Sequence, residues 1–240
     1  MELFTDLHIH SCLSPCGDEE MTPGNILGMA VVKGLDVIAI ADHNSARNLP
    51  AANAVAEAYG ILLLPAIEIT TREEVHLLGY FPSVHAAVEF GEMLRPHLPK
   101  RKNSPALFGE QLIMDENDQV TGAEDALLIG ASDLTLEHCS AQVRAFGGVP
   151  VPAHINRGSN GLLVNLGLMP KTPHFPTVEV WRDLPCPLAP LENRHVLHSS
   201  DAHYLGDIQE RIFALHPPEK SVEALLRWMD SPASAPFAPS

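Results

Sequence analysis

The sequence predicts a mixed α/β fold built from parallel strands that are joined by helices. Short apolar runs alternate with helix-like segments along the 240 residues, and several runs end in a charged residue or a histidine. Repeated strand–helix units of this kind form parallel sheets. An open doubly wound sheet is an alternative, but no glycine-rich phosphate loop follows the first strand. We therefore expect a closed or nearly closed barrel.

The first third of the chain contains two strand–helix units and two further strands. A strand is expected at residues 3–10, followed by a helix that Thr22 caps, with Pro23 in its first turn and Gly34 after its end. The apolar run 35–43 is typical of a strand buried on both faces. A helix and two more strands are then expected at residues 50–60, 61–70 and 73–81.

The pattern is interrupted at residues from about 82 to 134 and then resumes. This segment carries the basic run Lys100–Arg101–Lys102 and a hairpin-like turn. We interpret it as an insertion within the domain that lies over the active site. After it, Thr135 caps a helix that ends at Gly147 and Gly148. The later strands are expected at 149–155, 177–181 and 194–203, and the last helix at 221–229.

One domain is expected over residues 1–230. Residues 231–240 are rich in Pro, Ala and Ser and are expected to form a flexible tail.

Composition restricts the expected binding partners and the expected cellular location of the protein. The chain has 30 acidic and 15 basic residues and a net charge of −15. This argues against an extended nucleic-acid platform, which needs clustered Lys and Arg. The N-terminus lacks the basic and apolar parts of a signal peptide, and no run is long enough to span a membrane. Four scattered cysteines are too few for a disulfide scaffold. We expect a cytoplasmic protein with no membrane partner.

The first strand carries a metal-binding pattern. Side chains of a strand alternate between faces, so Asp6, His8 and His10 are expected on one side. Leu7 and Ile9 are expected on the other side, under a helix. A carboxylate and two imidazoles are costly to bury unless a partner neutralises them. A divalent cation would do so.

Other metal-ligating side chains gather at the ends of later strands, where α/β barrels place their active sites. Asp201 and His203 are two residues apart and are expected on one face of the last strand. Asp6 and Asp42 are expected to orient neighbouring histidines through a ring N–H. The mixture of nitrogen and carboxylate oxygen suits two or three ions of zinc, manganese or iron. The predicted metal ligands are His8, His10, His43, Glu68, His76, His154, Asp201 and His203.

The remaining histidines have a simpler interpretation. A histidine at a strand end is more often a hydrogen-bonded structural residue than a ligand. This interpretation suffices for His85, His97, His138, His174, His195, His198 and His216.

Five segments, DLHIHS, IADHN, IEIT, PAHINR and SSDAH, occur in this order across nearly the whole chain. Together they resemble the motifs of the polymerase-and-histidinol-phosphatase (PHP) domain family. The resemblance implies a distorted (β/α)7 TIM-like barrel with up to three divalent metal ions at its mouth. It also implies hydrolysis of phosphate esters. By the same resemblance, the ligands of the three ions are His8, His10, Glu68 and Asp201; Glu68, His76 and His154; and His43 with His203.

The resemblance breaks at one position. The family usually has Ser-Asp-Gly shortly after the histidine pair, and that aspartate helps to hold the third metal ion. This chain has SCLSPCGD instead. Either Cys16 or Asp18 substitutes for the aspartate, or the third site is weak or empty.

The expected reaction is metal-dependent hydrolysis of a phosphate ester. A water that bridges two divalent ions loses a proton near neutral pH and would attack phosphorus. Arg157 is predicted to grip the phosphate with two hydrogen bonds, and Asn44 is a second candidate for that contact. Arg157 and Asp42 are the candidate catalytic residues. The expected substrate is a small phosphorylated metabolite, a nucleotide or an oligonucleotide end.

Three alternatives stay open. An amidohydrolase also begins with His-x-His, but it usually carries a lysine ligand on a strand. A TatD-like metal nuclease shares the His-x-His pair, a glutamate and later histidines, whereas the Asp42–His43 and Asp201-x-His203 pairs favour the PHP pattern. The third alternative is a metal-binding module without turnover. Ligands retained on the first and last strands argue against it.

Overall fold

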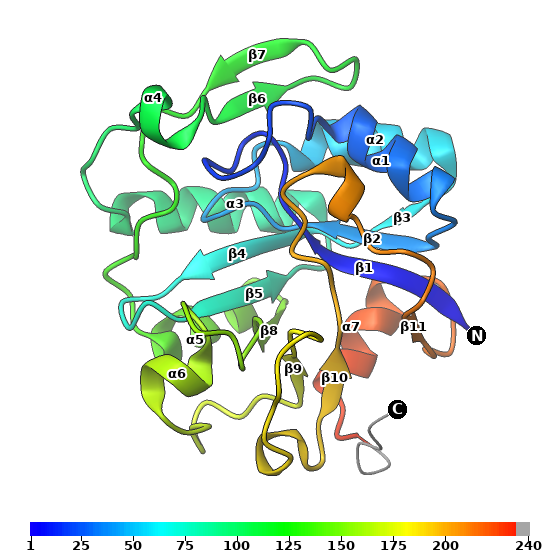
Figure 1. The fold of residues 1–240 in the computed structure, drawn as a ribbon, viewed down its shortest axis with the longest axis vertical. Helices are drawn as coiled ribbons and strands as arrows, with labels where there is room; N and C mark the ends of the chain where they lie inside the picture. The colour runs from blue at the N-terminus through cyan, green and yellow to red at the C-terminus, as the bar shows by residue number, and fades with distance from the viewer. Residues whose placement is uncertain (234–240) are drawn as a thin grey trace.

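Strands and helices alternate along the computed structural model, which describes residues 1–233 (Figure 1). The strands are β1 (Leu3–Ile9), β2 (Val37–Ile40), β3 (Leu62–Leu63), β4 (Ala66–Thr70), β5 (His76–Tyr80), β6 (Leu112–Met114), β7 (Val120–Ala123), β8 (Val149–Pro152), β9 (Thr177–Glu179), β10 (His195–Leu197) and β11 (Ala214–Leu215). The helices are α1 (Pro23–Val32), α2 (Leu49–Tyr59), α3 (Val84–Leu94), α4 (Pro105–Phe108), α5 (Leu136–Ala145), α6 (Leu162–Leu166) and α7 (Val222–Asp230). Short 3₁₀ turns occupy Arg95–His97, Ala189–Leu191 and Leu205–Asp207.

Helix boundaries follow local capping chemistry. The side chains of Thr22, Ser83, Thr135 and Ser221 each accept a hydrogen bond from the backbone N–H three residues later. Each bond satisfies a group that the first turn of a helix leaves unpaired. Gly60 ends α2 with a φ of 71°, a left-handed conformation that glycine adopts at low cost. The expected α1, α2, α5 and α7 are confirmed.

The described strands form four hydrogen-bonded sheets. In the sheet β11–β1–β2–β3, β2 pairs in parallel with both β1 and β3, and β11 is antiparallel to β1. β9 and β10 form a parallel pair, and β6 and β7 form an antiparallel hairpin. In the sheet β4–β5–β8, β5 is antiparallel to both neighbours. An entirely parallel architecture is therefore wrong. Residues 71–75 are too few for the crossover of roughly a dozen residues that parallel pairing of β4 and β5 would need.

Short backbone links connect these sheets where the strands end. The described strands do not form one continuous closed barrel, but each link joins strands or strand-following loops of two different sheets. The links are the His43–Glu68 bridge after β2, the 2.9 Å hydrogen bond from Ile155 N–H to the Glu179 carbonyl after β8, and the Ile9–Ala202 bridge after β10.

Two expected strands are shorter than predicted. The run 61–70 is divided into β3 and β4 at Pro65, which has no N–H to donate to a neighbouring strand. The run 194–203 stops at Leu197, so the last residues of that run form a loop.

β1 is also less regular than predicted. Its register against β2 shifts between Asp6 and Ile9, and Leu7 and Ile9 pack in different apolar clusters. Their expected common face is therefore wrong, because an irregular register breaks the two-residue alternation.

Two apolar clusters hold the strands in place. One lies between strands and the helices α1, α2, α3 and α5 and includes Ile26, Phe90 and Val143. The other packs Leu225 of α7 against the strands, and Figure 1 shows α7 on the side of β1 opposite to α1. Helices therefore pack against the strands through both clusters.

Residues 82–134 divide into two parts. α3 packs beside α2 in the first cluster, whereas the hairpin β6–β7, which confirms the expected turn, contacts the loop after β1. There, Leu112 N–H donates to the Cys12 carbonyl over 2.8 Å. The insertion and the 1–230 domain boundary stay predictions, and residues 234–240 of the expected tail lie outside the described range. Within the described range, no helix is both long and apolar enough to cross a bilayer.

Candidate metal centre

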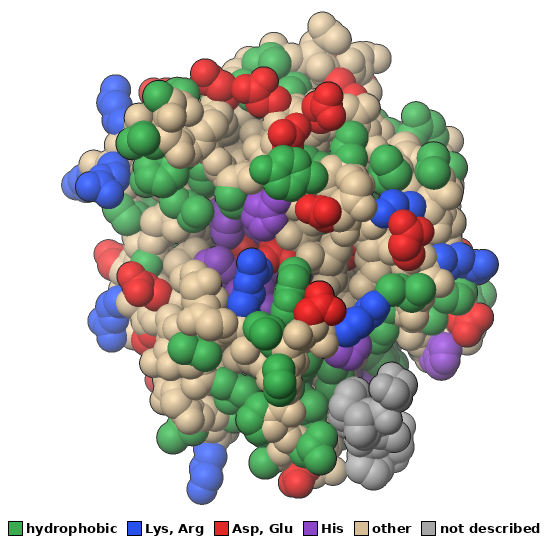
Figure 2. Space-filling view, viewed as in Figure 1, with side chains coloured by type: hydrophobic (Ala, Val, Ile, Leu, Met, Phe, Trp, Pro, Cys, Tyr) green, Lys and Arg blue, Asp and Glu red, His purple; other side chains and the backbone are tan. Residues whose placement is uncertain are grey.

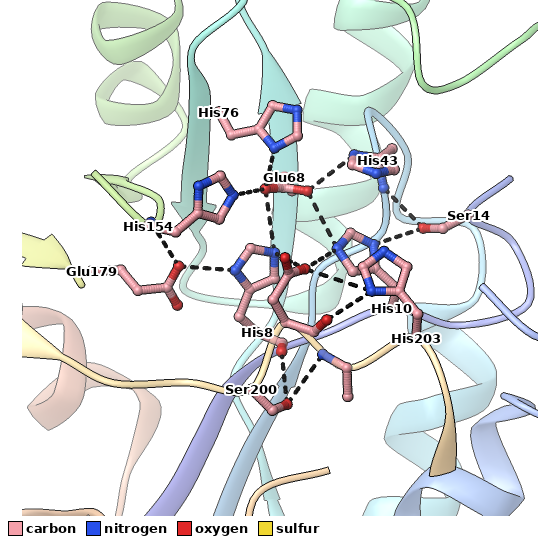
Figure 3. A network of polar contacts seen from close by, with 12 residues as sticks. His8, His10, Ser14, His43, Glu68, His76, His154, Glu179, Ser200 and His203 are labelled. Carbon is pink, nitrogen blue, oxygen red and sulfur yellow. Dashed lines mark hydrogen bonds and ion pairs between the residues drawn. The ribbon is translucent and has the colours of Figure 1, made fainter. Parts of the chain in front are cut away.

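The carboxylate of Glu68 lies at the centre of a group of histidines (Figure 3). Glu68 belongs to β4 and is 1% exposed. Each of its carboxylate oxygens faces more than one imidazole nitrogen. Oε1 lies 2.7 Å from His76 Nδ1, 3.2 Å from His154 Nε2 and 3.3 Å from His8 Nε2, and Oε2 lies 3.0 Å from His43 Nδ1 and 3.3 Å from His10 Nε2.

Asp201 supplies a second carboxylate. Its Oδ1 lies 3.0 Å from His10 Nε2 and 3.5 Å from His8 Nε2, and its Oδ2 pairs with Arg157. Because β10 ends before Asp201, the expected placement of Asp201 and His203 on one strand face is wrong. Both side chains reach the group from a loop. Asp201 has a φ of 50°, a strained conformation of the kind that clusters at functional sites.

Asp6 supports this loop instead of a histidine ring. Its carboxylate accepts the Ser200 N–H over 3.0 Å, the Ser200 hydroxyl over 2.6 Å and the Gln209 N–H over 2.8 Å. The expected contact of Asp6 with a ring N–H is wrong, because both carboxylate oxygens are engaged by the loop. Asp6 therefore positions the residue that precedes Asp201.

Three histidines have Nδ1 held by an acceptor, which leaves Nε2 facing the centre. The three contacts are His8 Nδ1 to Glu179 Oε2 at 3.0 Å, His10 Nδ1 to Ser14 Oγ at 2.9 Å and His203 Nδ1 to the Asp201 carbonyl at 2.7 Å. Carboxylate and carbonyl oxygens only accept, and the Ser14 hydroxyl donates its proton elsewhere, so Nδ1 carries the ring proton. In the neutral ring Nε2 then presents a lone pair, which is the form that binds a metal ion.

Glu179 supports the centre but is not among the residues predicted from the sequence. Its Oε2 accepts from His8 Nδ1 and also from the His154 N–H over 3.0 Å, and its side chain is buried. Burial by itself would raise the pKa of Glu179, but the neighbouring His8 lowers it. The signal was present, because Glu179 ends a strand in TVEVW just as Glu68 lies in a strand of IEIT.

Asp42 acts through serine hydroxyls. It accepts the Ser11 N–H and hydroxyl over 2.7 and 2.6 Å and the Ser14 hydroxyl over 2.7 Å. Ser14 Oγ in turn accepts from His10 Nδ1 and, over 3.1 Å, from the His43 N–H. These contacts support a positioning role for Asp42 rather than the predicted catalytic one. Asp42 is a positioning residue for His10.

Asn44 is also engaged by the protein itself. Its Nδ2 donates to the carbonyls of Leu128 and Gly130 over 2.7 and 3.1 Å, and its Oδ1 accepts the Thr70 N–H over 3.0 Å. The side chain is buried. These contacts support a structural role for Asn44, in which it ties residues 128–130 to β4, rather than the predicted contact with a substrate phosphate.

Charges within the group depend on each other strongly. Burial by itself would raise the pKa of Glu68, but the facing rings of His76 and His8 hold it well below its usual value. Burial disfavours a charge on His10, yet the hydrogen bonds to Asp201 and Glu68 raise its pKa to about 9. Burial lowers the pKa of His76 to about 4. The buried carboxylates therefore require positive charge beside them, which either protons or metal ions can provide.

The donor set fits divalent metal ions. Several buried donor atoms have no hydrogen-bond partner, among them His8 Nε2, His43 Nδ1, His76 Nδ1 and Glu68 Oε2. Buried polar atoms without partners are rare and need an explanation, and imidazole and carboxylate are ligands of zinc, manganese and iron. Three groups have ligand atoms within 4.8 Å of one another: His8, His10 and Asp201; His43, Glu68 and His76; and His10, Cys16, His43 and His203.

Of the two candidates for the third position, the structure brings Cys16 to the group and not Asp18. Cys16 Sγ lies 3.1 Å from His203 Nε2. The Asp18 carboxylate accepts the Glu20 N–H over 2.9 Å at the exposed end of the same loop.

Two adjoining cavities give access to the centre. One, of about 150 Å³, is lined by Glu68, His76 and His154, and the other is a groove of about 650 Å³. Arg157 lines both, and its guanidinium lies 4.7 Å from the centre of the Trp181 ring. Figure 2 shows histidine side chains on the floor of a hollow in this face, beside a basic side chain. Arg157 is thus placed where it can contact a molecule in either cavity.

Comparisons with known sequences are limited to part of the chain. No family model matches it. A 5′-3′ exoribonuclease of Haemophilus influenzae is 32% identical over 149 residues, which cover 60% of this chain and 52% of that protein. An uncharacterized protein of Methanocaldococcus jannaschii is 34% identical over 84 residues, which cover 32% of this chain and 48% of that protein. The chain thus matches about half the length of these curated relatives.

Comparisons with solved structures extend over most of the chain and show the fold. Endonuclease Q from Pyrococcus furiosus, a lesion-specific endonuclease, has a TM-score of 0.69 at 17% identity, covering 95% of this chain and 56% of that one. A Bifidobacterium adolescentis protein assigned as a metal-dependent phosphoesterase has a TM-score of 0.57 at 22% identity, covering 84% of this chain and 88% of that one. The chain therefore has a mixed α/β fold that these two proteins share.

Proposed function

We propose that this chain is a PHP-type hydrolase that uses two or three divalent ions of zinc, manganese or iron to cleave a phosphate ester. The observation that carries the proposal is the Glu68 carboxylate, which faces five imidazole nitrogens within 3.3 Å. A single glutamate cannot satisfy so many buried rings by hydrogen bonding, whereas divalent metal ions could be held by its two oxygens and the facing nitrogens.

The proposed assignment of ligands is the one that the resemblance to the PHP family implies. The contacts of Glu68 and Asp201 support it for the first two ions. His8, His10, Glu68 and Asp201 would hold one ion; Glu68, His76 and His154 a second; and His43 and His203 would contribute to a third. Ions bound there would lower the pKa of a water molecule toward 7 and offset negative charge on phosphoryl oxygens.

The chain's own groups would orient the substrate. Arg157 is predicted to bind phosphate oxygens with its planar guanidinium, because it lines both cavities and its side chain is 38% exposed. Its pairing with Asp201 and its place over Trp181 would hold the guanidinium at the edge of the centre. Asp42 and Ser14 would keep the His10 ring in position.

The groove supports a nucleotide or an oligonucleotide end as substrate. Its lining includes Trp181, Arg157 and Arg182 together with Asp201 and His203 of the centre. Nucleobases stack on aromatic rings, and phosphates pair with arginine. The exoribonuclease relative fits this substrate class. Endonuclease Q is described in complex with a 27-mer duplex that carries an abasic lesion. For this chain, the absence of an extended nucleic-acid platform stays a prediction.

We also propose that the fold is a distorted (β/α)7 barrel. β1, β2, β4, β5, β8, β9 and β10 would follow one another around the centre. The backbone links from the residue after β2 to β4, from the loop after β8 to β9, and from the loop after β10 to β1 support this order.

The test combines metal counting with turnover. Chelator-treated protein would be reloaded with zinc, manganese or iron, its metal content measured by elemental analysis, and hydrolysis assayed on p-nitrophenyl phosphate, nucleoside monophosphates and 5′-phosphorylated oligonucleotides. Wild type should hold two or three ions and turn over at least one of these substrates. His8→Ala should lose metal and activity. The control is His97→Ala, whose ring pairs with Asp133 at the surface, and it should lose neither. Full metal content without hydrolysis would favour a binding module, and no metal uptake would contradict the proposal.

A further inference from the structure

Cys16 is the one sulfur atom among the candidate ligand groups of the described residues. Its Sγ lies 3.1 Å from His203 Nε2, and its side chain lines both the 150 Å³ cavity and the adjoining groove. The other cysteines, Cys12, Cys139 and Cys186, belong to none of these groups.

The loop that carries Cys16 is held against His203 by backbone contacts. Ser14 N–H donates to the Ser11 carbonyl over 3.0 Å and Gly17 N–H to the Ser14 carbonyl over 2.9 Å, so two tight turns precede and include Cys16. A Cβ atom at Gly17 would lie 2.3 Å from the Ser11 oxygen, so only glycine fits there. Asp18 N–H then donates to the His203 carbonyl over 3.0 Å. The position of the thiol is therefore part of the folded structure.

The His203 ring is oriented to present a lone pair to this thiol. Its Nδ1–H donates to the Asp201 carbonyl over 2.7 Å, which fixes the tautomer and leaves Nε2 without a proton in the neutral ring. Nε2 and the cysteine sulfur thus form two adjacent donors.

Neighbouring ligands limit the set that can share an ion with Cys16. His10 lies within reach, but its Nδ1 is bound to Ser14 and its Nε2 faces Asp201 and Glu68. His10 is therefore committed to the ion between those carboxylates. His43 faces only one of those carboxylates, that of Glu68, through Nδ1. Its ligand atom also lies within 4.8 Å of those of Cys16 and His203, and these three residues provide two nitrogens and one sulfur.

We propose that Cys16 binds the third metal ion as a thiolate, together with His43 and His203, and makes this position selective for zinc over manganese. The inference rests on the proposed function and concerns only its third ion. Thiolate is a soft ligand that favours zinc, whereas carboxylate suits manganese and magnesium. On binding, the S–H bond breaks, the sulfur electron pair forms the bond to the metal ion, and the proton passes to solvent.

Cobalt(II), a spectroscopic substitute for zinc, tests this ligand directly. Chelator-treated protein would be titrated with cobalt while total cobalt per chain and the absorption spectrum are recorded. A thiolate ligand produces a sulfur-to-cobalt charge-transfer band in the near ultraviolet, which nitrogen and oxygen ligands do not. The variants are Cys16→Ser, Cys16→Asp, which introduces the carboxylate of the family pattern, and the control Cys186→Ser.

Wild type and Cys186→Ser should show the band, and Cys16→Ser should lose it together with one cobalt ion per chain. Cys16→Asp should keep the cobalt ion but not the band. Its ratio of zinc affinity to manganese affinity should be lower than that of wild type. We expect this preference for zinc over manganese to fall by at least roughly 10–100-fold. That is the loss seen when a residue that only hydrogen-bonds to a metal ligand is removed. Retained cobalt stoichiometry in Cys16→Asp shows that the variant folds.

Cobalt uptake without the band, or a band that survives in Cys16→Ser, would overturn the thiolate assignment and leave the proposed function intact. No cobalt uptake by wild type would overturn both. Alkylation provides a second measurement, because zinc should protect Cys16 from iodoacetamide, as read by mass spectrometry of peptides. Cys186 should react equally with and without zinc. Equal labelling of Cys16 in both states would contradict the proposal.

Discussion

Oε2 of Glu179 accepts hydrogen bonds from both the His8 ring and the His154 backbone, each over 3.0 Å. One buried carboxylate therefore orients two candidate ligands that lie 146 residues apart in the chain. It also assigns the proton of His8 to Nδ1, so that Nε2 faces Glu68 and Asp201. Removal of a hydrogen-bond partner of this kind typically lowers metal affinity or activity by about 10–100-fold.

Glu179→Gln is expected to lower metal affinity by about 10–100-fold with little loss of folded structure. The amide keeps the shape of the side chain but loses the charge that favours the His8 N–H. Metal affinity would be measured by competition with a chromophoric chelator. Glu192→Gln, on an exposed residue, is the matched control. Unchanged affinity in Glu179→Gln would show that Glu179 does not orient His8.

Ser14→Ala is expected to weaken the ion at His10. The substitution removes the acceptor for His10 Nδ1–H and one of the donors to Asp42, so the ring loses its fixed tautomer. We expect a loss of about tenfold or more in affinity for one ion. Ser104→Ala, at a side chain without a capping hydrogen bond, should have no effect. If all ions bind as in wild type, the Asp42–Ser14–His10 chain has no role in the centre.

Arg157→Lys and Arg157→Ala are both expected to raise KM for the phosphorylated substrate while metal content stays at the wild-type value. A hydrogen bond to a charged group contributes about 1.5–3 kcal/mol, which corresponds to roughly 10–150-fold. Lysine should not restore binding, because it cannot form two parallel hydrogen bonds. Arg227→Lys on the exposed face of α7 is the control. A KM that stays at the wild-type value would remove Arg157 from the binding site.

Asn44→Ala is expected to reduce stability and leave KM unchanged. It would leave the Leu128 carbonyl and the Thr70 N–H without their partner, at a cost of about 1–3 kcal/mol in the free energy of unfolding. Denaturant unfolding and steady-state kinetics on the metal-loaded protein would separate the two effects. A raised KM at wild-type stability would restore the substrate-binding role predicted from the sequence.

Metal removal should make stability strongly dependent on pH. Burial opposes charge on His10 and His43, but contacts with neighbouring anionic groups raise both pKa values to about 9. Their stabilising contribution to the metal-free protein is fully present below the unfolded pKa of about 6.5 and is lost as pH rises through 9. Metal ions displace these protons, so the loaded protein should keep its stability over this range.

The measurement is the free energy of unfolding between pH 6.5 and 9, with and without metal. Saturating metal at about 100 times its Kd should add about 2.7 kcal/mol for each ion that binds only the folded state. A metal effect that falls as pH rises would contradict this competition between protons and metal ions.

Much of the scaffold could be predicted because it depends on nearby residues. Thr22, Thr135 and Ser221 cap helices through backbone groups three residues away, and the apolar runs predicted β2, β4 and β8. The strand direction of β5 could not be predicted from its apolar pattern, because parallel and antiparallel strands bury similar side chains. Its direction follows from the short connection to β4.

The sequence by itself determined which kinds of donor the centre contains, since histidine and carboxylate at strand ends have few other partners of matching chemistry. All eight predicted ligands lie in the candidate centre. Only the tertiary structure decided what each polar group contacts. Glu179 supports His8, Asp42 acts through Ser14, and Asn44 binds backbone carbonyls. The Cys16 thiol, rather than the Asp18 carboxylate, contacts the His203 ring. These contacts join residues far apart in the chain or on irregular loops. Their geometry depends on how the strand ends pack together, and a local pattern of residues does not specify this packing.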